Sequence, residues 1–106
     1  ATISDQSKKK NIESTRDGYL DDLNRLRVVK YNWNEQEDTD PKELGLIAQE
    51  VEEVFPGLIS QMNEDGEETT KGIKYSVLPV MLLKALQEAI AKIETLEARV
   101  TTLEAG

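Results

Sequence analysis

The chain has 106 residues, enough for one small domain, and 38% of them are hydrophobic, with few aromatic residues among these. It contains no cysteine and no histidine, which excludes disulfides, thiolate zinc sites, cysteine nucleophiles and histidine-based triads. A catalytic base in this chain must therefore be a lysine or a carboxylate. Because so small a core is thin, we expect association with copies of the same chain to add stability.

The net charge of −8 comes from the middle of the chain. Residues 34–70 carry one basic and twelve acidic groups, whereas the two kinds nearly balance on either side. This distribution argues against a nucleic-acid-binding surface. The longest apolar run, residues 77–83, is too short to span a membrane, and no signal-peptide pattern opens the chain. We expect a soluble product, intracellular when made, with no nucleic acid, membrane or cofactor among its partners.

The first part of the chain predicts a short helix and a strand after a polar segment. Residues 1–15 are polar and are expected to be extended. The apolar residues that follow recur at helical spacing, at Tyr19, Leu20, Leu23 and Leu26. The β-branched and aromatic residues 28–33 are typical of a strand, and residues 34–41 are predicted to form an acidic loop. The carboxylates of this loop lack the spacing and the glycine of an EF-hand, so no metal site is predicted at Glu35, Glu37, Asp38 and Asp40.

A second helix and a hairpin are predicted next. Apolar residues again recur at helical spacing, at Leu46, Ile47, Val51, Val54 and Phe55. The Pro56-Gly57 pair ends this helix. Residues 58–62 and 69–75 are typical of strands, and they flank Asn63-Glu64-Asp65-Gly66, whose Asp-Gly pair suits the tip of a hairpin.

The last segment, residues 77–104, predicts one long helix. It contains no glycine, and Pro79 lies in the first turn, where a missing N–H is harmless. A helix of this length extends about 42 Å, more than a domain of this size covers by itself. We therefore expect the helix to pack against a partner. The alternative is an amphipathic helix that lies on its own domain.

The apolar residues of this helix follow a heptad pattern. Position a is occupied by Leu86, Ile93 and Val100, and position d by Leu82, Ala89, Leu96 and Leu103. Opposite charges at g and e suit a parallel arrangement, in which Lys92 meets Glu97 and Arg99 meets Glu104 of the neighbouring chain. Branched residues at a with leucine at d favour dimers, whereas the wider apolar stripe formed by Leu83, Ala85 and Ile90 suits three or more helices. The heptads alone leave the number of chains open.

Several motifs in order carry a resemblance to a known family. Ser4-Asp5 is followed by Lys9, and then by Asn11 and Ile12. The run Gly-Leu-Ile-Ala-Gln-Glu-Val at residues 45–51 precedes Phe-Pro, and Lys-Tyr-Ser-Val-Leu follows at residues 74–78. Over residues 4–91 the chain resembles the self-cleaving intramolecular chaperone domains of endosialidase tailspikes, phage tail fibres and neck appendages. A family of membrane-bound transcription factors carries the same domain.

The resemblance implies self-cleavage by a Ser-Lys dyad. Carried over, the scissile bond is Ile3–Ser4, Ser4 is the nucleophile and Lys9 the general base. A lysine amine can act as a base once burial lowers its pKa. Attack by Ser4 on the preceding carbonyl would give an ester that water hydrolyses. Supporting roles are expected for Asp5, Asn11 and Gln49, the last as a hydrogen-bond donor near the scissile carbonyl or as a structural amide.

We therefore expect an α+β fold with short strands, a hairpin and a long C-terminal helix that forms a parallel trimeric coiled coil. Residues 1–3 would be the remainder of an upstream fibre, residues 4–76 the chaperone body and residues 77–106 the coiled-coil helix. The implied partners are two further copies and the upstream fibre of the same polypeptide. The expected place of action is the cytoplasm of an infected bacterium, with the domain absent from the mature virion after cleavage.

Two alternatives accompany this interpretation. Gln6 and Ser7 stand where related domains often carry arginine, which favours a trimerisation module that does not cleave and stays attached to its fibre. The Lys8-Lys9-Lys10 run is also compatible with phosphate binding, but no glycine-rich cradle accompanies it.

Overall fold

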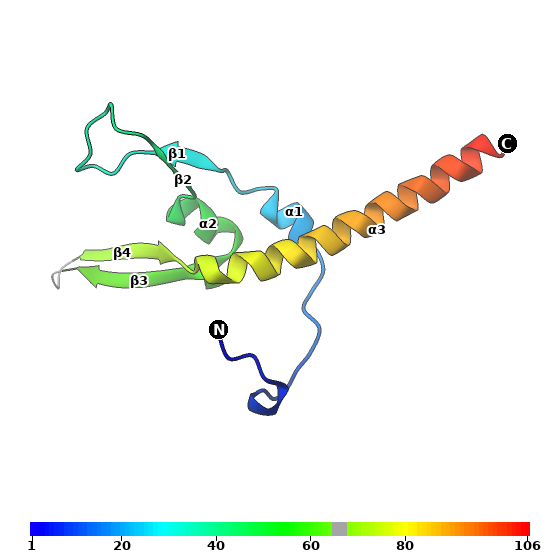
Figure 1. Ribbon diagram of the computed structural model, residues 1–106, viewed down its shortest axis with the longest axis horizontal. Helices are drawn as coiled ribbons and strands as arrows, with labels where there is room; N and C mark the ends of the chain where they lie inside the picture. The colour runs from blue at the N-terminus through cyan, green and yellow to red at the C-terminus, as the bar shows by residue number, and fades with distance from the viewer. Residues whose placement is uncertain (65–67) are drawn as a thin grey trace.

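A computed structural model of the chain describes residues 1–64 and 68–106. Its helices are α1 (Tyr19–Leu23), α2 (Ala48–Val54) and α3 (Leu78–Glu104). Its strands are β1 (Val29–Tyr31), β2 (Glu43–Gly45), β3 (Ile59–Glu64) and β4 (Glu68–Ile73). Short 3-10 turns are η1 (Gln6–Lys8), η2 (Pro56–Leu58) and η3 (Tyr75–Val77). The molecule measures 67 × 45 × 27 Å, because α3 extends far beyond a small body of short elements (Figure 1). The expected α+β class is confirmed.

The strands form two antiparallel pairs. In the first pair Val29 lies opposite Gly45 and Tyr31 opposite Glu43, and the acidic loop joins β1 to β2. In the second pair the register runs from Ile59 opposite Ile73 to Glu64 opposite Glu68. The predicted hairpin is confirmed, although Asp65 and Gly66 at its tip lie outside the described residues. Strand β2 was not predicted.

The core lies where α2, the base of the second hairpin and the first turns of α3 meet. Val51 of α2 and Phe55, which caps the end of that helix, pack with Leu58 and with Met81 of α3, and all four are buried. The 3-10 turn after Pro56 brings Leu58 back against α2, and the Lys74 N–H donates to the Leu58 carbonyl at 2.8 Å. This small core therefore fixes the start of α3 to the body.

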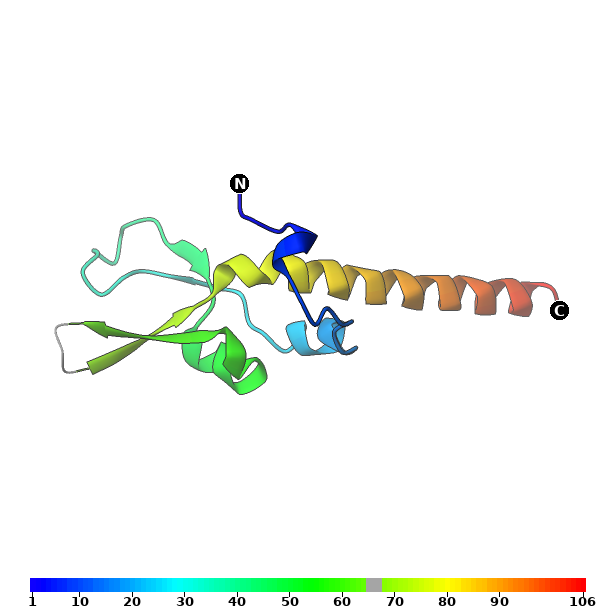
Figure 2. The ribbon, with the colours of Figure 1, turned by 90° about the horizontal axis from the view of Figure 1, so that it is seen from below.

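Helix α1 lies along α3, beyond the core (Figures 1 and 2). The Tyr19 ring stacks on Phe55 with centroids 6.3 Å apart, and the Arg16 guanidinium lies 4.5 Å from the centre of the Tyr19 ring. The predicted helix reached Leu26, but α1 ends at Leu23. The chain then turns, with the Leu26 N–H donating to the Leu23 carbonyl, and Leu26 still packs against the core.

Helix α3 begins one residue after the predicted start and ends at the predicted residue. Pro79 stands in its first turn, as expected. Met81 and Ala85 face the body and are buried, whereas most other apolar side chains of the helix are exposed. Among the described residues, no helix is long and apolar enough to cross a membrane.

Candidate cleavage site and assembly helix

The predicted nucleophile and base lie on a segment that extends away from the body. Residues 1–17, called here the N-terminal arm, are exposed throughout. In Figure 1 this arm extends from the start of α1 and lies below α3, and Figure 2 shows it from a second side. The arm was expected to be extended, but Gln6–Lys8 forms a 3-10 turn.

Asp5 is the reason for this turn. Its Oδ1 accepts a hydrogen bond from the Ser7 N–H at 2.8 Å, as an N-capping carboxylate does. The Lys8 N–H donates to the Asp5 carbonyl at 3.0 Å, and the Lys9 N–H to the Gln6 carbonyl at 3.1 Å. Hydrogen bonding from Ser7, first from its side chain and then from its backbone, lowers the pKa of the Asp5 carboxyl. The charged carboxylate therefore stabilises the turn.

The turn brings Ser4 and Lys9 together. Lys9 Nζ donates to Ser4 Oγ at 2.8 Å, a separation at which a neutral amine would be able to accept the hydroxyl proton. Neither Lys8 nor Lys10 makes a hydrogen bond to Ser4 in the described part of the chain. Lys9, to which the resemblance gives the role of base, is thus the lysine of this run that contacts the Ser4 hydroxyl.

The supporting residues differ in where they lie. Asp5 caps the turn, and Asn11 has a φ of 54°, a left-handed conformation that asparagine tolerates and that redirects the arm after Lys10. Gln49 is exposed on the first turn of α2. The N-terminal part of the arm and α2 lie on opposite sides of α3 in both views (Figures 1 and 2). One copy of the chain therefore does not bring Gln49 to the scissile bond.

Burial of the lysine was a requirement of the sequence-based mechanism. In the single chain both Ser4 and Lys9 are exposed, and no described residue outside the arm covers them. The local turn therefore forms the hydrogen bond between Lys9 and Ser4, but it does not remove the lysine from water.

The root of the arm is fixed to α3 by a residue that sequence reasoning missed. The Glu88 carboxylate accepts the backbone N–H groups of Gly18, Tyr19 and Leu20, each at 3.2 Å. It thus caps α1 from another helix, since Gly18 itself has no capping side chain. Gly18 has a φ of +100°, which a glycine adopts without strain. Gly18 offers no side-chain oxygen to cap the helix, and no local pattern in the sequence points to Glu88 as the residue that does so.

Ion pairs add to this contact between α1 and α3. Lys84 Nζ lies 2.9 Å from Asp17 Oδ1, and Lys92 Nζ lies 3.4 Å from Asp21 Oδ1. Hydrogen bonding to Asp17 raises the pKa of Lys84, so this amine stays charged at neutral pH. Lys92 was predicted to meet Glu97 of a neighbouring chain, whereas here it pairs within its own chain.

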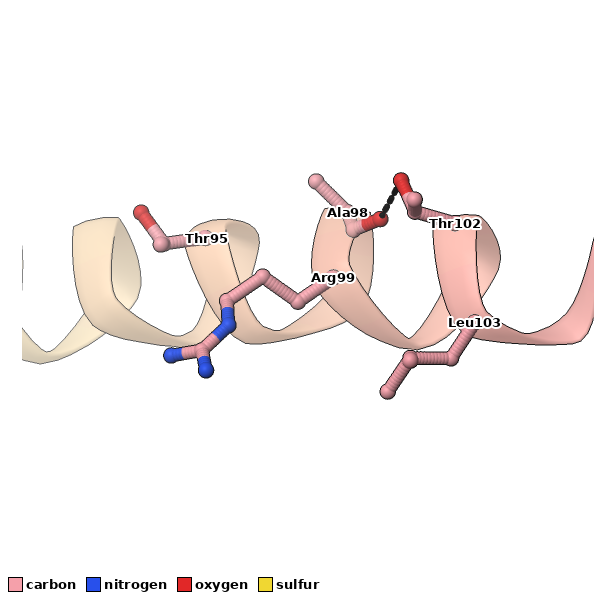
Figure 3. A pocket seen from close by; sticks show the side chains of 5 residues that line it. All are labelled: Thr95, Ala98, Arg99, Thr102 and Leu103. Carbon is pink, nitrogen blue, oxygen red and sulfur yellow. Dashed lines mark hydrogen bonds between the residues drawn. The ribbon is translucent and has the colours of Figure 1, made fainter.

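The heptad side chains of α3 do not lie on their own body. Most of them are between 51% and 80% exposed, namely Leu82, Leu86, Ile93, Leu96, Val100 and Leu103. Ala89 is half-buried. We call these seven residues the seam. Near the C-terminus, Arg99 and Leu103 project from one side of the helix and Ala98 and Thr102 from the other (Figure 3). The alternative of a helix that buries its seam on its own domain is wrong for this single chain.

A cavity of about 880 Å³ opens between the two strand pairs and the start of α2. Its lining is mostly aromatic, apolar or amide-bearing and includes Tyr31, Trp33, Ile47, Gln49, Met62 and Tyr75. We call this space the inter-hairpin cavity. The Trp33 ring meets Tyr31 edge-on with centroids 5.1 Å apart, and Trp33 is still 55% exposed. Burial is the main cause that raises the pKa of Tyr31, and the nearby Glu43 and Tyr75 raise it further, so the Tyr31 hydroxyl stays neutral.

Gly45, the first residue of the 45–51 motif, allows two tyrosines to converge behind this cavity. A Cβ atom there would lie 3.1 Å from Tyr31 Cε1 and 3.4 Å from Tyr75 Oη. The Leu46 N–H donates to Tyr75 Oη at 3.2 Å. A side chain at position 45 would therefore push the two rings apart, which explains why this motif starts with glycine.

Comparison with known proteins gives consistent results. Residues 4–60, more than half of the chain, match the family described as chaperone of endosialidase. A long tail fibre protein Gp37 of Enterobacteria phage M1 is 29% identical over 102 residues, covering 93% of this chain and 40% of that protein. The Gp37 protein of Enterobacteria phage Ox2 is 30% identical over 97 residues, covering 89% and 38%. An uncharacterized membrane protein of Dictyostelium discoideum is 35% identical over 74 residues, covering 58% and 4%. The chain thus spans about two fifths of these phage relatives.

Proposed function

The chain belongs to the chaperone of endosialidase family, and we propose that it assembles three copies of an upstream phage tail-fibre segment and then releases itself by cutting the Ile3–Ser4 bond. One observation carries the cleavage: Lys9 Nζ lies 2.8 Å from Ser4 Oγ across a turn that six adjacent residues are enough to build. The tail-fibre relatives support the fibre as the partner. The place of action would be the cytoplasm of the infected bacterium, where fibres are made.

The proposed cleavage uses Ser4 and Lys9 alone for proton transfer. Ser4 Oγ adds to the carbonyl carbon of Ile3, and its proton passes to Lys9 Nζ. The bond between that carbon and the Ser4 nitrogen breaks, the Lys9 ammonium returns the proton to the departing amine, and an ester joins Ile3 to Ser4 Oγ. One water molecule then hydrolyses the ester, which leaves a carboxylate on Ile3 and restores the Ser4 hydroxyl.

The exposed seam supports the assembly step. Six large apolar side chains along one face of a helix are costly to leave in water, and packing against other copies removes them from it. Leu83 and Ile90, at position e, are also exposed, so the apolar stripe is wider than a two-stranded seam needs. This width favours three helices over two.

Assembly of the domain would then act on the upstream fibre. Pairing of three long chains in register is a slow, non-local step with a risk of aggregation. A domain that associates first raises the effective concentration of the three upstream chains and aligns them. Once the domain is removed, an unfolded fibre has no means of aligning its three chains again. The folded fibre then persists because the barrier to its unfolding is high.

The test is a longer chain that carries fibre sequence upstream of Ile3. Mass spectrometry should find a fragment that begins at Ser4, and sedimentation should find that fragment as a trimer. Ser4→Ala should abolish the cut and leave the trimer, since it removes the hydroxyl from an exposed position and little else. An intact wild-type chain that is still trimeric would instead support the attached, non-cleaving module.

A further inference from the structure

The dyad and the motif glutamine are separated within one copy. Ser4 and Lys9 lie on the arm at one side of α3, and α2, which carries Gln49, lies at the other side (Figures 1 and 2). Helix α3 stands between them, and the root of the arm is held to α3 by Glu88. The inter-hairpin cavity of the same chain therefore does not contact the proposed scissile bond on this arm.

Assembly through the seam changes which groups are neighbours. When the α3 helices of several copies pack around a common axis, each copy presents its arm on one side of its α3 and its α2 on the other side. A contact between two different surfaces repeats around the axis and closes into a ring, as heterologous contacts do in cyclic oligomers. The arm of one copy then faces the inter-hairpin cavity of the next.

On the basis of the proposed function, we propose that the cleavage site is shared between copies: the arm of one copy lies in the inter-hairpin cavity of its neighbour, and Gln49 of that neighbour donates a hydrogen bond to the carbonyl of Ile3. The neighbour's cavity thus provides the surroundings that the exposed dyad lacks.

The chemistry of the cavity fits the arm. Ile3 is 80% exposed and stands directly before the scissile bond, and Ile47, Met62 and Ile73 give the cavity an apolar part that can receive it. Removing Lys9 from water between such walls favours its neutral form. The side-chain amide of Gln49 is a donor of the type that stabilises a developing oxyanion.

Charge also favours this pairing. The arm carries Lys8 and Lys10 on either side of the base, and neither forms an ion pair in the described residues. The loop after Trp33 borders the cavity and carries exposed carboxylates that no ion pair of the described chain uses: Glu35, Glu37 and Asp38. Opposite charges on an arm and on the rim of its cavity steer the two together and fix their register.

Mixed trimers provide the decisive experiment. One long chain keeps Ser4 and carries Gln49→Ala, and a second chain of different mass keeps Gln49 and carries Ser4→Ala. Alone, each should be uncut, with a loss of about 10²-fold or more for the glutamine variant. In mixed trimers at equal amounts, about half of the Ser4-bearing chains should be cut, because half of them have an intact neighbour.

The outcomes separate the two proposals. Rescue of the Ser4-bearing chain in mixed trimers supports the shared site. If the wild-type chain is cut and the mixture is not rescued, the site lies within one copy and this inference is wrong, although the proposed function stands. Normal cleavage of the Gln49→Ala chain alone also overturns it. If the wild-type chain itself is not cut, the proposed function fails first.

A disulfide tests the contact without any need for cleavage. The chain has no cysteine, so Ile3→Cys with Met62→Cys in a Ser4→Ala background gives one defined pair. Oxidation should join different copies into covalent dimers and trimers on a non-reducing gel. The matched control, Ile3→Cys with Leu44→Cys, places the second thiol on an exposed residue that does not line the cavity. Equal cross-linking in both pairs, or none in the first, contradicts the docking.

Discussion

The two ends of the molecule are both exposed, but they are built in opposite ways. The N-terminal arm is polar, and the turn that joins Ser4 to Lys9 depends on contacts within the six residues from Ser4 to Lys9. The second half of α3 is a regular helix with a long apolar seam that no described part of its own chain covers. The geometry of the dyad is thus a local property, and the order of the helix in water depends on other copies. The contact between Ser4 and Lys9 and the exposed seam are thus encoded in separate segments of the chain, and four changes test that separation.

The largest effect is expected for Lys9, the proposed base. Lys9→Met keeps much of the side chain but removes the amine, and cleavage of a long chain should fall by about 10²-fold or more, as for loss of a general base. Lys9→Arg should fail as well, since a guanidinium does not give up its proton at usable pH. The measurement is the rate at which the Ser4 fragment appears.

The adjacent lysines supply matched controls for that change. Lys8→Met and Lys10→Met should each lose far less activity than Lys9→Met, because neither side chain bonds to Ser4 and each supplies only part of the charge attraction between the arm and the cavity rim. Similar losses in all three methionine variants would mean that the positive charge of the arm matters and that no single lysine is the base.

The next largest effect is expected from a charge placed in the seam. Leu96→Asp places a charge among exposed apolar side chains and should shift the chain from trimer to monomer in sedimentation at micromolar concentration. Thr95→Asp, one residue earlier and outside the seam, is the control and should remain trimeric. The Lys9–Ser4 hydrogen bond should persist in the monomer, since it is local. A wild-type chain that sediments as a monomer would contradict the coiled coil itself.

A smaller effect is expected where the two regions meet. Glu88→Ala removes the carboxylate that caps α1, and the loss of such a cap costs about 1–2 kcal/mol of stability. Hydrogen exchange should become faster at the amides of Gly18, Tyr19 and Leu20. Glu94→Ala, also on α3 and without such a contact, should leave these amides unchanged. Unaltered protection in the Glu88 variant would show that α1 is held by packing alone.

The smallest effect is expected from a change to Asp5, which caps the turn of the arm. The pKa of Asp5 is lowered in the folded state, so its contribution is present above the ordinary pKa of aspartate and is lost as the pH falls through the lowered value. The Ser7 amide resonance should therefore move on acid titration, and in Asp5→Asn this movement should disappear. A pH-independent Ser7 resonance in the wild-type chain would mean that the cap is not formed in solution.

Much of the fold was predictable because it depends on local pattern. The run without glycine that follows residue 76, with Pro79 in its first turn, predicted the extent of α3 within one residue, and the Asp-Gly pair between two β-rich runs indicated the hairpin. Strand β2 was missed because Glu43–Gly45 is three residues long and has no β-branched or aromatic side chain. Helix α1 was predicted too long, since Leu26 continues the apolar spacing from a turn.

The site was predictable in part for the same reason. The Ser4–Lys9 pair followed from a resemblance, and its geometry required only the short turn that Asp5 caps. Glu88 was missed because it lies about seventy residues from the amides that it binds, and no local pattern records such a contact. The placement of Gln49 away from the dyad also depends on the tertiary fold, because α3 passes between them.

The position of the dyad within the chain has a consequence for what remains after the proposed cut. Both Ser4 and Lys9 lie after the scissile bond, so the fibre would leave with a plain carboxyl terminus and without any part of the cutting apparatus. The detached piece would start with the amino group of Ser4, which is largely protonated at neutral pH and stands beside the Lys9 amine. With the Ile3 carbonyl gone, this fragment no longer carries the bond that Ser4 attacks. The reaction would thus be self-limiting, because each chain carries one Ile3–Ser4 bond and cuts it once.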